Sequence, residues 1–205
     1  MIRNDREYRC FIPLKPERRE EGEEPSYIVE GYASTFEPYV LFEEEGIQYN
    51  ECIDPKAFDG CDMSDVVFLK DHTGTVMART KNQTVQLMVD SHGLKTRVDL
   101  SKSKCAREMY EEIGNGLYDQ MSFAFTVEED SYDRATHTRT ILKFRKIYDV
   151  SAVGFPANPG TEIGVSARSI LDGAIQEERA ERLAEEKRQE TKKRIEMKIR
   201  LMNMR

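Results

Sequence analysis

The sequence has little of what metal and cofactor sites require. Among 205 residues there are three histidines and four cysteines. The cysteines form neither a CxxC pair nor a paired CxxC/HxxxH arrangement, so the usual zinc patterns are excluded. The glycines are dispersed, and no glycine-rich phosphate loop is present. We therefore expect no metal and no cofactor.

Other classes of protein are disfavoured by absences of a different kind. The start of the chain, Met1 to Asp5, is polar and no apolar segment follows it, so we expect no secretory signal and reduced thiols in a cytosolic protein. No apolar run approaches the roughly 18 residues that a membrane span needs. The net charge of −7 argues against a nucleic-acid binder, which usually carries a basic patch.

Composition divides the chain into three parts. The hydrophobic fraction is 39% and the charged fraction 34%, as expected for one moderate core with polar extensions. We expect a flexible N-terminal arm over residues 1–25, a folded domain over 26–168 and a charged tail over 169–205. The tail holds 10 Lys and Arg against 8 Asp and Glu, and the rest holds 21 against 30, so the acidity belongs to the other two parts.

Within the arm, three prolines bracket a charged run that has no apolar periodicity. Arg9 to Ile12 still has the character of an edge strand. The body, by contrast, is rich in β-forming residues. We expect strands over 27–36, 47–53, 66–69, 84–89, 94–100, 118–128, 138–147 and 148–154.

Local signals refine this pattern. Asp54 to Phe58 is typical of a short helix start, with Asp54 as cap and a proline in the first turn. The hairpin turn before residue 94 offers Gly93 for positive φ. One helix is expected inside the body, over 101–116, capped by Ser101 or Ser103. The fold class is therefore mainly β with helices, α+β.

The segment from Ile170 to Arg205 is helical in character, with no proline and a single glycine. Pairs such as Glu190 and Arg194 place a glutamate four residues before an arginine, which supports a helix. Its apolar stripe is broken, whereas a sustained coiled coil needs a continuous seam. We expect a solvated helix that docks on a partner or stays flexible.

Three β-like segments each carry one polar group that acyl-transfer chemistry needs. His72 follows a buried-looking strand and suits a general base. Ser122 is inert unless a base takes its proton, and Asp149 would orient the imidazole. Each has a structural alternative when taken alone: a histidine at a strand end, a serine that packs, or a surface carboxylate. They form a catalytic set if the strands converge.

Other residues fit these roles less well. Asp71 adjoins His72, but neighbours in a strand point to opposite faces. Cys105 and Cys52 are alternative nucleophiles with no histidine close in sequence.

Taken together, the segments resemble the prohead proteases of tailed phages, the capsid-maturation serine proteases whose fold is similar to the herpesvirus assemblins. The sequence differs from the usual family pattern at Lys56, Asp71, Ala124 and Asp149. At Asp149 the family usually has Glu, so the carboxylate is kept with a shorter reach. The resemblance runs, in order, through Gly31 to Ala33, Glu51 to Phe58, Val67 to His72, Asp90 to Leu94, Met121 to Phe125, Tyr148 to Val153 and Pro156 to Pro159.

The resemblance implies an assemblin-like, mostly antiparallel β-barrel with flanking helices. It implies a serine endopeptidase with Ser122, His72 and Asp149 as catalytic residues. The expected substrates are the scaffold protein or the scaffolding segment of the major capsid protein, and the enzyme's own tails. The expected place is the interior of the assembling procapsid in the host cytoplasm, and the expected state a homo-oligomer such as a dimer. The rival interpretation is a catalytically silent assembly protein that keeps the barrel.

Overall fold

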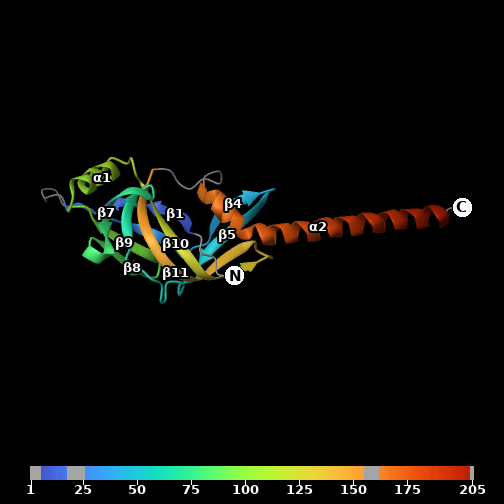
Figure 1. The fold of residues 1–205 in the computed structure, drawn as a ribbon. Coiled ribbons are helices and arrows are strands. Elements are labelled where there is room, and N and C mark those ends of the chain that lie inside the picture. The colour runs from blue at the N-terminus through green and yellow to red at the C-terminus, as the bar shows by residue number, and fades with distance from the viewer. Residues whose placement is uncertain (1–5, 18–25, 155–161, 204–205) are drawn as a thin grey trace. The chain divides into compact units, whose positions relative to one another are not determined.

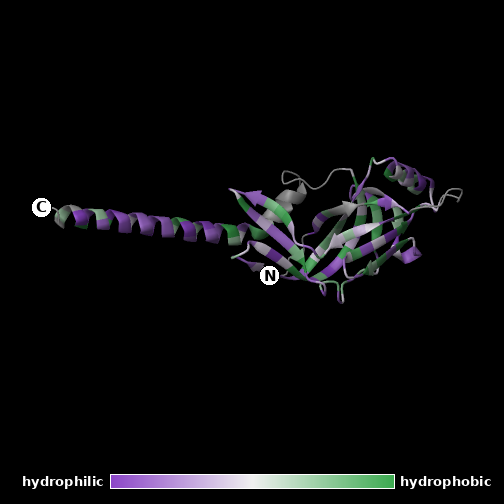
Figure 2. Cartoon of the chain, turned by 180° about the vertical axis from the view of Figure 1, so that it is seen from behind, coloured by the Kyte–Doolittle hydropathy of each residue, from purple (hydrophilic) through white to green (hydrophobic). Residues whose placement is uncertain are grey.

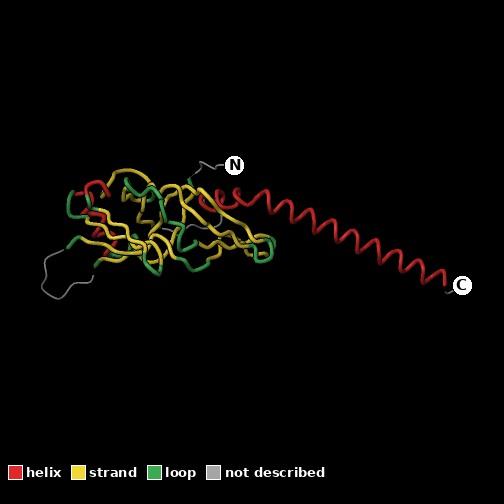
Figure 3. The backbone as a smooth tube through the Cα atoms, turned by 90° about the horizontal axis from the view of Figure 1, so that it is seen from below, coloured by secondary structure: helices red, strands yellow, loops and turns green. Residues whose placement is uncertain are grey.

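A computed structural model of the protein describes residues 6–17, 26–154 and 162–203. The chain divides into two compact units, Met1–Val165 and Ser166–Arg205 (Figure 1). Strands dominate the first unit, and one long helix, α2 (Glu162–Asn203), makes up the second (Figure 3). The Pro156 to Pro159 segment of the family resemblance lies outside the described residues.

The larger sheet of the first unit has seven strands, five of them in the order β1-β10-β11-β5-β4. The short strand β6 pairs with β11 and also with β7. The long strand β11 therefore has parallel neighbours at both ends, β5 near its start and β6 near its end. The strands are β1 (Glu7–Pro13), β4 (Tyr39–Glu44), β5 (Ile47–Ile53), β6 (Val67–Lys70), β7 (Thr73–Arg79), β10 (Gln120–Asp133) and β11 (Thr138–Val153).

The second sheet has four strands in the order β2-β3-β9-β8. Helix α1 (Lys104–Gly114) follows β9, and Ser103 caps it by accepting a hydrogen bond from the Ala106 amide at 3.1 Å. The remaining elements are β2 (Lys15–Pro16), β3 (Ile28–Thr35), β8 (Val85–Val89), β9 (Gly93–Asp99) and a 3₁₀ helix, η1 (Thr80–Asn82).

The core of the first unit contains apolar side chains from both sheets and from α1. Phe123, Phe125 and Phe144 pack together with ring centroids 4.6 to 5.9 Å apart. Every residue of β10 from Met121 to Val127 is buried, so both faces of this strand are covered. The hydropathy colouring follows this division, because apolar segments gather in the strands while α2 is largely hydrophilic (Figure 2).

Several expectations from the sequence are confirmed. The hairpin of β8 and β9, the strand over 47–53 and the helix with its Ser103 cap all form. No helix in the described part of the chain is long and apolar enough to cross a membrane.

Other expectations are wrong. Neither sheet closes into a barrel in the described residues; both remain open. Asp54 to Phe58 forms turns rather than a helix, because the Asp54 carbonyl accepts from the Ala57 amide and the chain then turns again. Residues 138–153 form one strand instead of two. Residues 7–16 of the expected flexible arm form β1 and β2.

Gly93 is required for a reason other than the expected positive φ. A Cβ at this position would lie 2.0 Å from the backbone oxygen of Ser34 on β3. The pairing of β3 with β9 therefore needs a residue without a side chain here.

We expect Gly93→Ala to lower the free energy of unfolding by about 2–3 kcal/mol, because the backbone contact forces strand separation. Urea denaturation measures the change. Gly173→Ala is the control, since a Cβ there meets no atom within 4 Å, and it should cause no loss. Equal stability of Gly93→Ala and wild type would contradict the close approach.

Candidate active site

His72 lies in the two-residue turn between β6 and β7. Lys70 pairs with Thr73 across this turn, and Asp71 and His72 both have positive φ, 47° and 58°. Positive φ at both positions is typical of the type I′ hairpin turn, which usually contains Asn and Gly. A histidine in this region is uncommon, and such strain is concentrated at functional sites. The sheet holds the turn in place, because the Asp71 amide donates to the Ala152 carbonyl at 3.0 Å.

Ser122 and Asp149 lie on the adjacent strands β10 and β11. The antiparallel register pairs Ser122 with Ser151 and Ala124 with Asp149, so Ser122 and Asp149 are diagonal neighbours on one face. Diagonal side chains on a sheet are about 7–8 Å apart, too far for a direct hydrogen bond. A third group has to bridge them.

The imidazole of His72 is that bridge. Its Nδ1 lies 2.6 Å from Asp149 Oδ1, and its Nε2 lies 2.7 Å from Ser122 Oγ. Because Nδ1 faces a carboxylate, it carries the proton, and Nε2 of the neutral ring is left as the acceptor. The structure thus brings the three residues proposed from the sequence into one chain of hydrogen bonds, the arrangement of a Ser-His-Asp triad.

The site is largely shielded from water. Ser122 has no exposed surface, Asp149 is 4% exposed, and the His72 side chain is 12% exposed. A buried carboxylate requires hydrogen-bond donors. Asp149 Oδ1 receives a second one, the hydroxyl of the buried Ser151 at 2.9 Å. Ser151 shares a strand face with Asp149 because it is two residues further along β11, but the sequence alone assigns it no role.

The other residues that could take these catalytic roles make different contacts, away from the Ser122–His72–Asp149 chain. The Asp71 carboxylate accepts from the Gly154 amide at 3.3 Å rather than from His72. The Cys52 thiol is 3.2 Å from Thr140 Oγ1, and Cys105 lies on α1. His92 packs against the Tyr32 ring, with centroids 4.5 Å apart.

Strand β1 borders the site, which sequence reasoning missed. Cys10 pairs with Ser122 in the β1–β10 register. The Ser122 hydroxyl lies 2.8 Å from the Arg9 carbonyl oxygen, and the Tyr8 ring meets the His72 ring edge to face at 4.7 Å. A hydroxyl has a single proton to donate, so the Arg9 carbonyl competes with His72 for it.

A network of buried ion pairs fastens β1 to the sheet. Arg9 donates to Glu51 at 2.5 and 2.8 Å, and Arg139 donates to Glu51 at 2.7 Å and to Glu7 at 2.6 Å. All four side chains are at least 96% buried. Burial alone would raise the pKa of Glu51, but the charges of Arg9 and Arg139, with hydrogen bonds from Arg9 and Tyr39, outweigh it and hold the pKa at about 2.

We expect Glu51→Gln to lower the free energy of unfolding by about 3 kcal/mol at pH 7, since it leaves two buried guanidinium groups short of a partner. The folded-state pKa lies below the ordinary 4.5, so this stabilisation is present above pH 4.5 and is lost as the pH falls towards 2. The variant should therefore lose less stability than wild type over that range. Denaturant titrations at several pH values measure both effects.

The exposed Glu37→Gln is the matched control and should behave as wild type. An unchanged stability of Glu51→Gln at pH 7 would contradict the role given to the buried network.

Residues 14–174 match the family described as Caudovirus prohead serine protease. The chain belongs to this family. The resemblance seen in the sequence is thereby confirmed. Membership of this family implies capsid proteins in general as substrates. No curated protein and no solved structure matches the chain.

The family match includes His72, Ser122 and Asp149 and most of both sheets, but ends at residue 174. Most of α2 therefore lies beyond it. Strand β1 precedes the matched region, although its Arg9 carbonyl reaches Ser122. The edge-strand character of Arg9 to Ile12 is the sequence signal for β1, but it does not say which strand β1 pairs with.

Proposed function

We propose that this protein is a serine endopeptidase that acts inside the immature phage capsid. The scaffold protein or the scaffolding segment of the major capsid protein would be its substrate, together with its own tails. One observation carries the proposal: the continuous hydrogen-bond chain from Ser122 through His72 to Asp149. Family membership supports it independently.

In the proposed mechanism, Ser122 Oγ attacks the scissile carbonyl carbon while His72 Nε2 accepts the hydroxyl proton. The same proton passes to the leaving amine, which departs and leaves an acyl-enzyme ester. Water, deprotonated by His72, then attacks the ester carbonyl; the bond to Ser122 Oγ breaks, the carboxyl product leaves and His72 returns the proton to Oγ. Asp149 keeps the imidazole oriented and stabilises the imidazolium. Backbone N–H groups would supply the oxyanion hole that this chemistry requires.

Access to Ser122 is part of the proposal. Its hydroxyl is fully covered and shared with the Arg9 carbonyl, so a substrate carbonyl reaches it only after the covering residues shift. The Arg9 carbonyl of the edge strand β1 is the group that has to release the hydroxyl, while the buried ion pairs keep the strand itself in the sheet. Coupling this shift to capsid assembly would restrict proteolysis to the right place.

The direct test is Ser122→Ala, assayed by peptide bond cleavage of the capsid and scaffold proteins. We expect turnover to fall by about 10⁴-fold or more, because the nucleophile is lost. Ser34→Ala is the control: it is an equally buried serine whose hydroxyl has no partner among the described residues. Processing by Ser122→Ala at the normal rate would contradict the assignment of Ser122 as the nucleophile. Absence of processing by wild type would favour the catalytically silent assembly protein.

Ser151 should act as a positioning residue through Asp149. We expect Ser151→Ala to lower kcat about ten-fold with KM unchanged, because one hydrogen bond to a buried charged group contributes about 1.5–3 kcal/mol. Steady-state kinetics measure kcat and KM. Ser34→Ala again serves as control, and a variant with an unaltered kcat would remove Ser151 from the site.

A further inference from the structure

The second unit has an uneven charge distribution along its helix. Residues 172–190 hold seven acidic and four basic side chains, whereas residues 191–205 hold one acidic and six basic ones. All residues from Ala180 to Arg200 are exposed. The helix therefore presents an acidic half followed by a basic half to its surroundings, with the change of sign at Thr191.

All but Met197 of the large apolar side chains that are exposed on the described part of α2 are arranged about the same point. Four apolar side chains are each more than half exposed: Leu183 (54%), Ile195 (52%), Ile199 (52%) and Met202 (76%). With Ala180, Lys187 and Thr191 they form a stripe with intervals of 3, 4, 4, 4, 4 and 3 residues. Their mean of about 3.7 residues is close to the helical period, but each step of four residues advances the stripe by about 40°, so the stripe winds around one side of the helix. The order of intervals reads the same from either end, with Thr191 at its centre.

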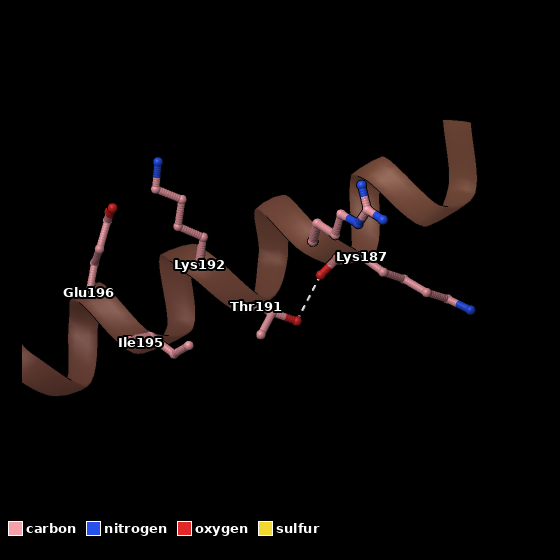
Figure 4. A pocket seen from close by; sticks show the side chains of 6 residues that line it. Lys187, Thr191, Lys192, Ile195 and Glu196 are labelled. Atoms are coloured by element: carbon pink, nitrogen blue, oxygen red, sulfur yellow. Dashed lines mark hydrogen bonds between the residues drawn. The ribbon is translucent and has the colours of Figure 1, made fainter. Parts of the chain in front are cut away.

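Figure 4 shows the middle of this stripe. The shallow surface there is lined by residues of α2 alone, from Lys187 to Glu196. Thr191 donates its hydroxyl to the Lys187 carbonyl at 2.7 Å, so its polar atom is satisfied within the helix and its methyl group is left to make contacts. Among the described residues, no other element contributes to the lining of this surface.

We propose that α2 pairs antiparallel with α2 of a second copy of the chain, about a two-fold axis at Thr191. A two-fold interface uses the same patch on both copies, which a stripe symmetric about one residue provides. The pairing places Ala180 opposite Met202, so that a small side chain faces a long one, while Leu183 and Ile199 flank the contact on its two sides. Lys187 would lay its aliphatic stem against Ile195 and keep its charge in water.

Charge decides the orientation. Antiparallel pairing sets the acidic half of each helix against the basic half of the other, and brings Glu190 near Arg194 of the second copy. Parallel pairing in register would instead oppose like charges along the full length, which is destabilising. The proposal gives the broken stripe and the charge asymmetry one common explanation. It does not depend on the proteolytic activity.

Light scattering of the full chain tests association. The chain should carry Ser122→Ala so that self-cleavage cannot remove the helix. We expect a mass of twice 23.8 kDa that falls towards 23.8 kDa on dilution or at high salt. Ile195→Glu with Ile199→Glu should give the single-chain mass, whereas Met197→Glu, an exposed residue outside the stripe, should leave the dimer intact. A monomer at all concentrations, or a dimer that survives the double substitution, would overturn the proposal.

Cysteine cross-linking tests the orientation. Thr191→Cys should form a disulfide-linked dimer with itself, because the two copies meet at the axis. Ala180→Cys should not link to itself but should link to Met202→Cys in a mixture. The parent chain, with its four native cysteines, controls for other links. Self-linking of Ala180→Cys would show a parallel pair, and failure of Thr191→Cys to link would exclude the two-fold axis.

Discussion

The antiparallel pairing of β10 with β11 is the constraint on which the site depends. Its register makes Ser122 and Asp149 diagonal neighbours, separated by the space that one imidazole fills. Successive strand residues point to opposite faces, so a slip of one residue would turn the serine away from the carboxylate. The parallel pairing of β6 with β11 then brings the turn that carries His72 over this gap. Two strand pairings thus assemble three residues that lie 77 positions apart at most.

The buried charges on the other side of the sheet have a related role. Glu7 and Arg9 on β1 meet Glu51 and Arg139, and together they hold an edge strand against β10. An ion pair of this kind contributes less to stability than its short distances suggest, because its groups lose their hydration. It does specify which strand lies beside Ser122. The position of the Arg9 carbonyl beside the covered hydroxyl of Ser122 is a consequence of that placement.

Much of the site could be predicted from the sequence, because its signals are local. The β-forming segment around Ser122, the apolar strand before His72 and the Ser103 cap each depend on a few neighbouring residues. The placement of β1 could not be predicted, since a charged segment with prolines resembles a solvated arm. Its partners are distant: Arg139 lies 132 residues from Glu7. Whether a sheet closes into a barrel depends likewise on tertiary contacts, which no local pattern encodes. The same holds for the close approach of Gly93 to the Ser34 backbone.

The central claim is that Ser122 is a nucleophile activated by His72. The most direct measurement is covalent labelling with a fluorophosphonate, followed by peptide mapping, in the wild type and in His72→Ala. The account predicts one phosphonylated residue, Ser122, in the wild type and loss of labelling in His72→Ala. An unlabelled wild type, a label on another residue, or labelling of Ser122 that does not depend on His72 would contradict it.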